Sequence, residues 1–375
     1  MSHNPSAAPA LNKFQLGMFG LNCSGGLTST TAPERWSASW DDTVRAARVA
    51  DESGLDFMLP IGRWRGFGGK SDRQGNTFET LTWATGLLQA TQRVSVFGTV
   101  HVSLIHPVFA AKQVVTADHV GHGRFGLNVV SGWNVGEFSM FGAELLEHDE
   151  RYEYTEEWIT IVRRIWRETD PFDFKGKYFD LQSVIGRPKP VRPSGPKIMS
   201  AGSSPAGRAF AGRHADALFM VIVDGPKLQD EIEALRSAAQ RPVGVFASGH
   251  MMSRRTEKET REFYDYIVNE KGDWEAAEQV IEARIAGGGQ SIPPERIRSM
   301  KERFISGGGT YPVIGSYDNV AQTFKNLSDA GLNGMALGLV NYVEDGAVLR
   351  DEILPRMERL GLRAPHQQSA LAALA

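Results

Sequence analysis

An asparagine interrupts an apolar segment near the middle of the chain. Residues 123–152 read GRFGLNVVSGWNVGEFSMFGAELLEHDERY. The first part is a short apolar run between Gly123 and Gly132, which is typical of a strand covered on both faces. Asn128 is the polar exception, and a buried amide needs a hydrogen-bond partner from the protein or from a bound molecule. The sequence leaves these two interpretations of Asn128 open.

A turn of small residues has the composition of an anion-binding site. Gly202, Ser203 and Ser204 lie between a predicted strand and a predicted helix. The free N–H groups and the positive dipole end of a helix start can hold a phosphate group. The same residue types also form the ordinary N-cap of many helices. The local sequence therefore indicates either a phosphate site or a simple cap.

Arg151 and Tyr152 stand at the start of a predicted helix. A cation at that position opposes the helix dipole unless an anion or a carboxylate compensates it. A bound phosphate would compensate it, and so would a surface ion pair with Asp149 or Glu150. Arg151 and Tyr152 are accordingly candidates for the anionic end of a ligand site, with the surface ion pair as the alternative.

Further polar residues follow two of the predicted strands. Glu137 lies in the Gly/Asn loop after the strand of Asn128, where it could accept hydrogen bonds from a bound ring or polyol, or face solvent. His101 and Ser103 follow an earlier strand and could donate to a substrate or an oxyanion. A histidine in that position can equally serve to satisfy backbone groups.

The sequence does not indicate a metal site or a covalent nucleophile. His119 and His122 have HxxH spacing, but Gly121 and Gly123 interrupt the helix and no third ligand lies nearby. Cys23 has no recognisable histidine and acid partners. Because Cys23 is the only cysteine, no intrachain disulfide can form, which fits a reducing cytoplasm.

The elements that position these residues form an alternating pattern. Eight short apolar segments alternate with helical sequence, which predicts parallel βα units. A doubly wound sheet would usually carry G-x-G-x-x-G after its first strand, whereas NCSGGLTSTT follows here. Polar and Gly-rich residues follow the first five strands, as in a TIM (β/α)8 barrel. The predicted strands are 14–19, 55–61, 94–100, 124–130, 197–201, 217–223, 242–247 and 335–340.

Length and composition suit one large soluble enzyme domain. The chain has 375 residues, 41% hydrophobic and 23% charged, with a formal net charge of −3. This charge offers no general attraction for nucleic acid or anionic lipid, and no apolar run is long enough to span a membrane. We expect one domain over 13–362, loose tails at 1–12 and 365–375, and a lid-like insertion at 270–312 in the C-terminal half.

Five motifs together identify a family resemblance. The segments VVSGWNVGEF, LEHDERY, GRFGLN, RGFGGK and AGSSPAG resemble the bacterial luciferase-like, FMN-dependent monooxygenases. Within that family they are similar to the pyrimidine and dimethyl sulfone monooxygenase group. The similarity extends from about residue 14 to 360 and is thinnest between about 255 and 312.

The resemblance implies a fold, a cofactor and a site. It implies a TIM barrel that binds reduced FMN supplied by a separate NAD(P)H-dependent flavin reductase and uses O2 as co-substrate. It also implies a cytoplasmic homodimer or homotetramer. Asn128 would be catalytic, and His101 and Ser103 would face the substrate. The implied flavin-contacting positions are Gly62, Arg63, Asn128, Glu137, Arg151, Tyr152 and Ser204.

The chain departs from the pyrimidine enzyme at two places. That enzyme has an apolar side chain at the position of Gly62 and a lysine at the position of Arg63, so only backbone contact is expected from Gly62. GTVHVSLIHP also replaces a Thr-rich segment. EHDERY and the SGG of NCSGGL resemble the sulfone enzyme, whereas RGFGGK resembles the pyrimidine enzyme.

The resulting hypothesis is a two-component monooxygenase. It would oxygenate a small organic substrate and break a C–N or C–S bond, in a cyclic amide or heterocycle, or in a sulfone or sulfonate. Two alternatives use the same barrel. One is hydride transfer with a deazaflavin, and the other is flavin binding without turnover.

Overall fold

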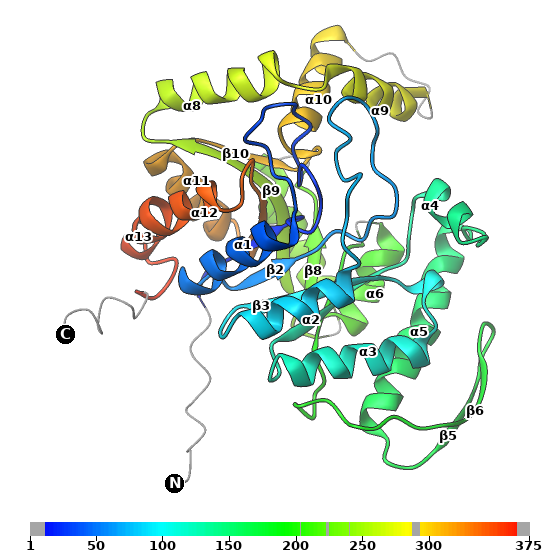
Figure 1. Ribbon diagram of the computed structural model, residues 1–375. Coiled ribbons are helices and arrows are strands. Elements are labelled where there is room, and N and C mark those ends of the chain that lie inside the picture. The colour runs from blue at the N-terminus through cyan, green and yellow to red at the C-terminus, as the bar shows by residue number, and fades with distance from the viewer. Residues whose placement is uncertain (1–11, 203, 223–224, 240, 287–292, 366–375) are drawn as a thin grey trace.

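The computed structural model describes residues 12–365 except 203, 223–224, 240 and 287–292. Eight parallel strands close into a barrel in which the last strand pairs with the first (Figure 1). This confirms the predicted TIM-type barrel. In barrel order the strands are β1 (Gln15–Phe19), β2 (Phe57–Leu59), β3 (Ser95–His101), β4 (Phe125–Val130), β7 (Lys197–Ser200), β8 (Ala217–Met220), β9 (Gly244–Arg254) and β11 (Gly334–Gly338).

Helices surround the barrel because each carries one apolar face. In α5 (His148–Arg167), residues Trp158, Ile161, Val162, Ile165 and Trp166 are buried at the predicted helical spacing. This helix begins one turn earlier than expected from Arg151. The other surrounding helices are α1 (Trp40–Glu52), α2 (Thr80–Ala90), α3 (Pro107–Val120), α6 (Pro205–His214), α7 (Leu228–Ala238), α11 (Tyr317–Asp329), α12 (Glu344–Val348) and α13 (Leu354–Arg359).

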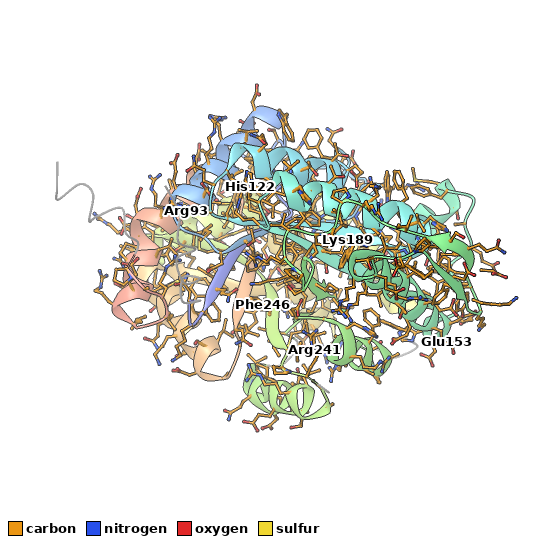
Figure 2. The ribbon with its side chains drawn as sticks, turned by 90° about the horizontal axis from the view of Figure 1, so that it is seen from below. Arg93, His122, Glu153, Lys189, Arg241 and Phe246 are labelled. Atoms are coloured by element: carbon orange, nitrogen blue, oxygen red, sulfur yellow. The ribbon has the colours of Figure 1, made fainter. Side chains whose placement is uncertain are left out.

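Three phenylalanine rings fill the lower part of the barrel. Each ring lies against a glycine of a neighbouring strand, and a Cβ added to Gly17, Gly126 or Gly334 would come within 2.4, 2.4 and 2.8 Å of its ring. The Phe57 ring contacts the rings of Phe97 and Phe246 edge to face. Figure 2 views the molecule from this end, which carries an open cavity of about 330 Å³.

Strand β9 is longer than predicted and pairs with a strand that sequence patterning missed. We expected a strand over 242–247, but β9 continues to Arg254, and its second half pairs in parallel with β10 (Tyr311–Ser316). Pro312 and Gly315 in YPVIGS weaken the strand pattern. Proline is tolerated here because β10 is an edge strand.

A helical insertion lies between β9 and β10, above the barrel in Figure 1. It contains α8 (Glu257–Tyr264), a π-helical segment Asp265–Glu270, α9 (Trp274–Ala286) and α10 (Pro294–Gly307). Residues 274–286 and 294–307 of the expected excursion are thus helical, whereas 287–292 lie outside the described residues. Of the predicted tails, residues 1–11 and 366–375 also lie outside them.

Two smaller elements flank the barrel on the side of α5. The strands β5 (Phe172–Lys175) and β6 (Asp180–Val184) form an antiparallel pair. The loop after β4 contains a short helix, α4 (Val135–Met140), where no helix was predicted. None of the helices in the described part of the chain is both long enough and apolar enough to cross a membrane.

Candidate active site

A cavity of about 360 Å³ opens at the carboxyl ends of the barrel strands. Four residues predicted from the sequence line it together: Gly62 and Arg63 after β2, His101 at the end of β3, and Asn128 in β4. Parallel strands bring these distant positions to one end of the barrel. Most of the other lining is apolar: Phe19, Leu27, Pro60, Ile61, Phe67, Val130, Trp133, Ala201, Phe219 and Val221.

The orientation of the Asn128 amide is fixed by a short hydrogen-bond chain. The hydroxyl of Thr99 donates to the Pro60 carbonyl at 2.7 Å. The Thr99 oxygen therefore accepts from Asn128 Nδ2, at 3.1 Å. Asn128 Oδ1 is buried and has no partner among the described residues. Asn128 is 5% exposed, and its Oδ1 can therefore accept a hydrogen bond from a ligand that has an N–H group.

His101 brings a neutral imidazole to the same cavity. It is 8% exposed. Burial lowers the pKa of His101, and the Arg63 guanidinium lowers it further, against an opposing effect of Glu137. Ser103, also predicted to face the substrate, does not line the cavity, and its buried hydroxyl has no partner within the described part of the chain.

Glu137 and Arg63 form a buried ion pair beside the cavity. Arg63 Nη1 lies 3.2 Å from Glu137 Oε1, and the two side chains are 8% and 3% exposed. Arg63 Nε also donates to Gln74 Oε1 at 3.1 Å. Glu137 accepts from the backbone N–H groups of Trp64 (2.9 Å) and Arg65 (3.3 Å). These bonds fix the loop after β2, while flavin contact by Glu137 stays a prediction.

Two other predicted residues, Ser204 and Tyr152, lie at the N-terminal end of α6, and Arg151 precedes Tyr152 in α5. Ser204 is the N-cap, and its hydroxyl accepts from Gly207 N–H at 3.2 Å. The Tyr152 hydroxyl lies over Gly207, where an added Cβ would be 2.6 Å from it. Arg151 Nη1 donates to the Gly132 carbonyl. Because Ala201 lines the main cavity and leads into this turn, an anion at α6 would lie next to that cavity.

Sequence reasoning missed a second arginine at the cavity. Arg73 is buried between the rings of Phe67 and Phe304, 4.3 and 4.4 Å from their centroids. It donates to the Leu27 carbonyl at 2.8 Å. Its neighbour Gln74 has a positive φ of 63°, an unusual backbone conformation that is frequent at functional sites. No spacing in this polar loop marked either residue.

The insertion and the extended strand contribute a second set of missed residues. Ser248 of β9, with Gly308 and Thr310 after α10, lines the cavity. The strand predicted over 242–247 ended one residue before Ser248. A search for continued small and apolar residues through GVFASGHMMSR would have extended it.

Comparisons with known proteins agree with this geometry. Residues 14–334 match the model of the family described as luciferase-like monooxygenase. The chain is 31% identical over 348 residues to the FMNH2-dependent dimethylsulfone monooxygenase of Pseudomonas putida, covering 90% of this chain and 94% of that protein. It is 28% identical over 358 residues to a pyrimidine monooxygenase of Bradyrhizobium sp. BTAi1, covering 91% and 96%.

A solved structure shows the same fold. The long-chain alkane monooxygenase superposes with a TM-score of 0.82 at 19% identity, covering 96% of this chain and 94% of that one. The match of the family model over most of the chain, with these relatives, shows that the chain belongs to the luciferase-like monooxygenase family.

Proposed function

We propose that this chain is the oxygenase component of a two-component flavin monooxygenase. It binds reduced FMN at the mouth of the barrel and uses O2 to oxygenate a small organic substrate, with cleavage of a C–N or C–S bond. Membership of the family supports the reaction type, and the named relatives, a dimethylsulfone and a pyrimidine monooxygenase, support the two substrate classes.

The fixed acceptor of Asn128 is the observation that carries the proposal. A flavin ring carries N–H groups, and Asn128 Oδ1 is a buried acceptor without a partner among the described residues. The Thr99 and Pro60 oxygens leave the amide only one orientation with good hydrogen bonds. The chain's residues therefore fit the ring of FMN at this place.

The residues around α6 fit the phosphate of FMN. The helix start provides a positive dipole end, although Pro205 has no N–H and the Gly207 N–H is bonded to Ser204. Ser204 uses its hydroxyl oxygen as an acceptor, so its O–H can still donate to an anion. The Tyr152 hydroxyl has no partner recorded in the described part of the chain and lies over the first turn of α6. We assign Ser204, Tyr152 and the neighbouring Arg151 to this end.

The protein's contribution is binding, orientation and exclusion of water. Reduced FMN, when bound, supplies the electrons that activate O2. Asn128 orients the ring, and the apolar lining around Phe19, Leu27 and Phe219 keeps water from the reacting atoms. Gly308 and Thr310 of the insertion contribute to the lining, which supports the proposal that the segment 270–312 covers the bound substrate.

We also propose the cellular setting of the reaction. A separate NAD(P)H-dependent reductase supplies the reduced FMN, and the protein works in the cytoplasm as a homodimer or homotetramer. Light scattering of the purified protein tests the oligomer.

An assay with labelled oxygen tests the activity. Purified protein receives reduced FMN, isotopically labelled O2, and either dimethyl sulfone or the cyclic amide uracil. Label in a substrate-derived product supports the proposal. Anaerobic hydride transfer with a tightly bound deazaflavin would support the first alternative, and flavin binding without product would support the second.

Two substitutions test the site. Asn128→Ala and Arg151→Ala are each expected to weaken reduced FMN binding by about tenfold, as for the loss of a buried hydrogen bond or charge contact. Anaerobic titration of FMN fluorescence measures the affinity. Unchanged affinity in both variants contradicts the assignment.

A further inference from the structure

At the cavity wall, the His101 imidazole fills the space that a side chain at residue 62 would need. A Cβ added at Gly62 would be 2.8 Å from His101 Cε1 and 3.2 Å from its Nδ1. Gly62 is not among the glycines with a positive φ, so its backbone does not require glycine. The requirement is spatial, because any side chain at residue 62 displaces the imidazole.

The imidazole has hydrogen-bonding capacity that the protein does not use. Neither ring nitrogen of His101 has a recorded partner among the described residues, although the residue is more than nine-tenths buried. The ring nitrogens are not among the buried atoms that lack a partner, so they are open to the cavity, where water or a bound ligand can pair with them. A neutral imidazole offers one N–H donor and one acceptor nitrogen.

The charged groups around His101 favour an uncharged ligand. The nearest charges are those of Arg63 and Glu137, which neutralise each other in a buried pair. Burial keeps the ring itself neutral. The surrounding lining includes Ile61 and Val130. Arg73, the other cation of the cavity, is packed between the rings of Phe67 and Phe304 and is not among the charges that act on His101. At the His101 wall, a neutral molecule with one oxygen acceptor and an apolar remainder therefore fits better than an anion does.

We propose that Gly62 and His101 act as one specificity-determining unit for the substrate. His101 donates its N–H to a sulfonyl or carbonyl oxygen of an uncharged substrate, and Gly62 keeps that position open for the ring. This inference rests on the proposed monooxygenase function. It assigns to the pair the selection of neutral sulfones or cyclic amides over sulfonates.

A double-mutant cycle tests the pair with dimethyl sulfone, uracil and methanesulfonate as probes. His101→Ala is expected to raise KM for the preferred neutral probe by about tenfold while kcat changes less than about threefold, because a binding hydrogen bond is lost. His101→Gln retains a donor and is expected to recover part of the loss. Gly62→Ala is expected to match His101→Ala, and the double variant to be no worse than either single variant.

Two controls separate this role from a flavin contact or a folding defect. Affinity for reduced FMN is expected to stay within about twofold of wild type in the His101 variants, since Asn128 and the α6 end hold the flavin. His106→Ala removes an exposed histidine from the same β3–α3 connection and is expected to leave KM unchanged. Unchanged KM in His101→Ala, weakened FMN binding, or additive effects of the two substitutions would overturn the proposal.

A readout without turnover keeps this test distinct from that of the proposed function. The imidazole Cε1–H resonance of His101, identified by its loss in His101→Ala, is expected to shift when dimethyl sulfone or uracil is added to the FMN-loaded protein, and not with methanesulfonate. Labelled product with no shift overturns the role of His101 alone. A shift without labelled product supports the role of His101 and contradicts the monooxygenase assignment.

Discussion

Two walls of the cavity are built in opposite ways. The insertion wall comprises residues 22–36 and the described residues of the insertion, 257–286 and 293–310. Here Ser29 N–H donates to Ile305 O (2.8 Å), Thr31 N–H to Lys271 O (2.8 Å), and Asp273 N–H to Ser29 O (2.9 Å). The α4 wall comprises residues 131–147 and exposes large apolar side chains, namely Trp133, Val135, Met140 and Phe141.

The α4 wall is attached mainly through side chains. Phe138 is buried against Gly132, Glu137 is paired with Arg63, and Arg151 donates to the Gly132 carbonyl. The insertion wall is instead held by backbone bonds between two segments. Loss of a single side chain is therefore expected to be tolerated by the insertion wall and to disturb the α4 wall, where the Glu137–Arg63 pair is the buried ion pair.

The largest effect is expected from Glu137→Ala. This change leaves the Arg63 charge buried without its carboxylate and frees the N–H groups of Trp64 and Arg65. Breaking a buried pair from one side costs about 3–5 kcal/mol of unfolding free energy. Urea unfolding measures the cost. Glu137→Gln keeps an acceptor oxygen for the two N–H groups and is expected to lose clearly less.

The same variants are expected to separate stability from binding. Arg63 lines the cavity, so its release in Glu137→Ala is expected to weaken reduced FMN binding as well. A loss below about 1 kcal/mol in Glu137→Ala, within the range of an ordinary surface change, would show that the α4 wall has other anchors.

The second-largest effect is expected at low pH, where the free energy of unfolding falls because of His250 at the insertion wall. His250 lies under Gly307 and donates from Nδ1 to Thr310, since the Thr310 hydroxyl itself donates to the Gly307 carbonyl. Burial lowers the pKa of His250 to about 3, and Arg303 contributes. Below pH 6.5 the unfolded chain therefore binds a proton that the folded chain does not. As the pH is lowered below 6.5, this group decreases the free energy of unfolding by about 1.4 kcal/mol per pH unit.

His250→Asn tests that contribution because the asparagine Nδ2 can replace the donor Nδ1. Between pH 7 and pH 5 the wild type is expected to lose about 2 kcal/mol more unfolding free energy than the variant. Unfolding curves at the two pH values give the difference. Equal losses would mean that His250 does not couple the insertion wall to pH.

The smallest effect is expected from Thr30→Val. The Thr30 hydroxyl shares its hydrogen between the carbonyls of Ile267 (3.0 Å) and Lys271 (3.1 Å). Its oxygen accepts from the Ala32 N–H (3.2 Å), and valine has the same shape without this donor and acceptor. The expected cost is about 1–2 kcal/mol. Reduced FMN affinity is expected to remain that of wild type, because the backbone bonds of Ser29 and Thr31 stay. A change in that affinity would refute the redundancy of this wall.

The sequence predicted the barrel and the residues at its strand ends better than the residues on its loops. Asn128 stands out because an amide is unusual in an apolar strand. In the structure its Oδ1 has no hydrogen-bond partner among the described residues. Gly62, Arg63 and His101 follow strands whose ends must meet. Arg73 and Thr310 reach the cavity through loop paths that no local pattern encodes, since those paths depend on contacts between distant segments.

The sequence pattern also does not predict the direction in which a side chain points. Glu137 and Ser103 lie close in sequence to residues of the cavity, yet neither lines it. The carboxylate of Glu137 is used by Arg63 and two backbone groups. The positions of these residues in the sequence predict that they lie near the cavity. The directions of their side chains depend on contacts with residues that are distant in the sequence.

The rings packed on glycines at the lower end of the barrel have an evolutionary consequence. A methyl group at Gly17 would collide with Phe57, and the same holds for Gly126 with Phe97. Neither member of a pair can change size alone without strain or a void. Across the family we expect each glycine and its ring to be inherited together or replaced together. These pairs are then a record of descent that is independent of the chemistry at the opposite end of the barrel.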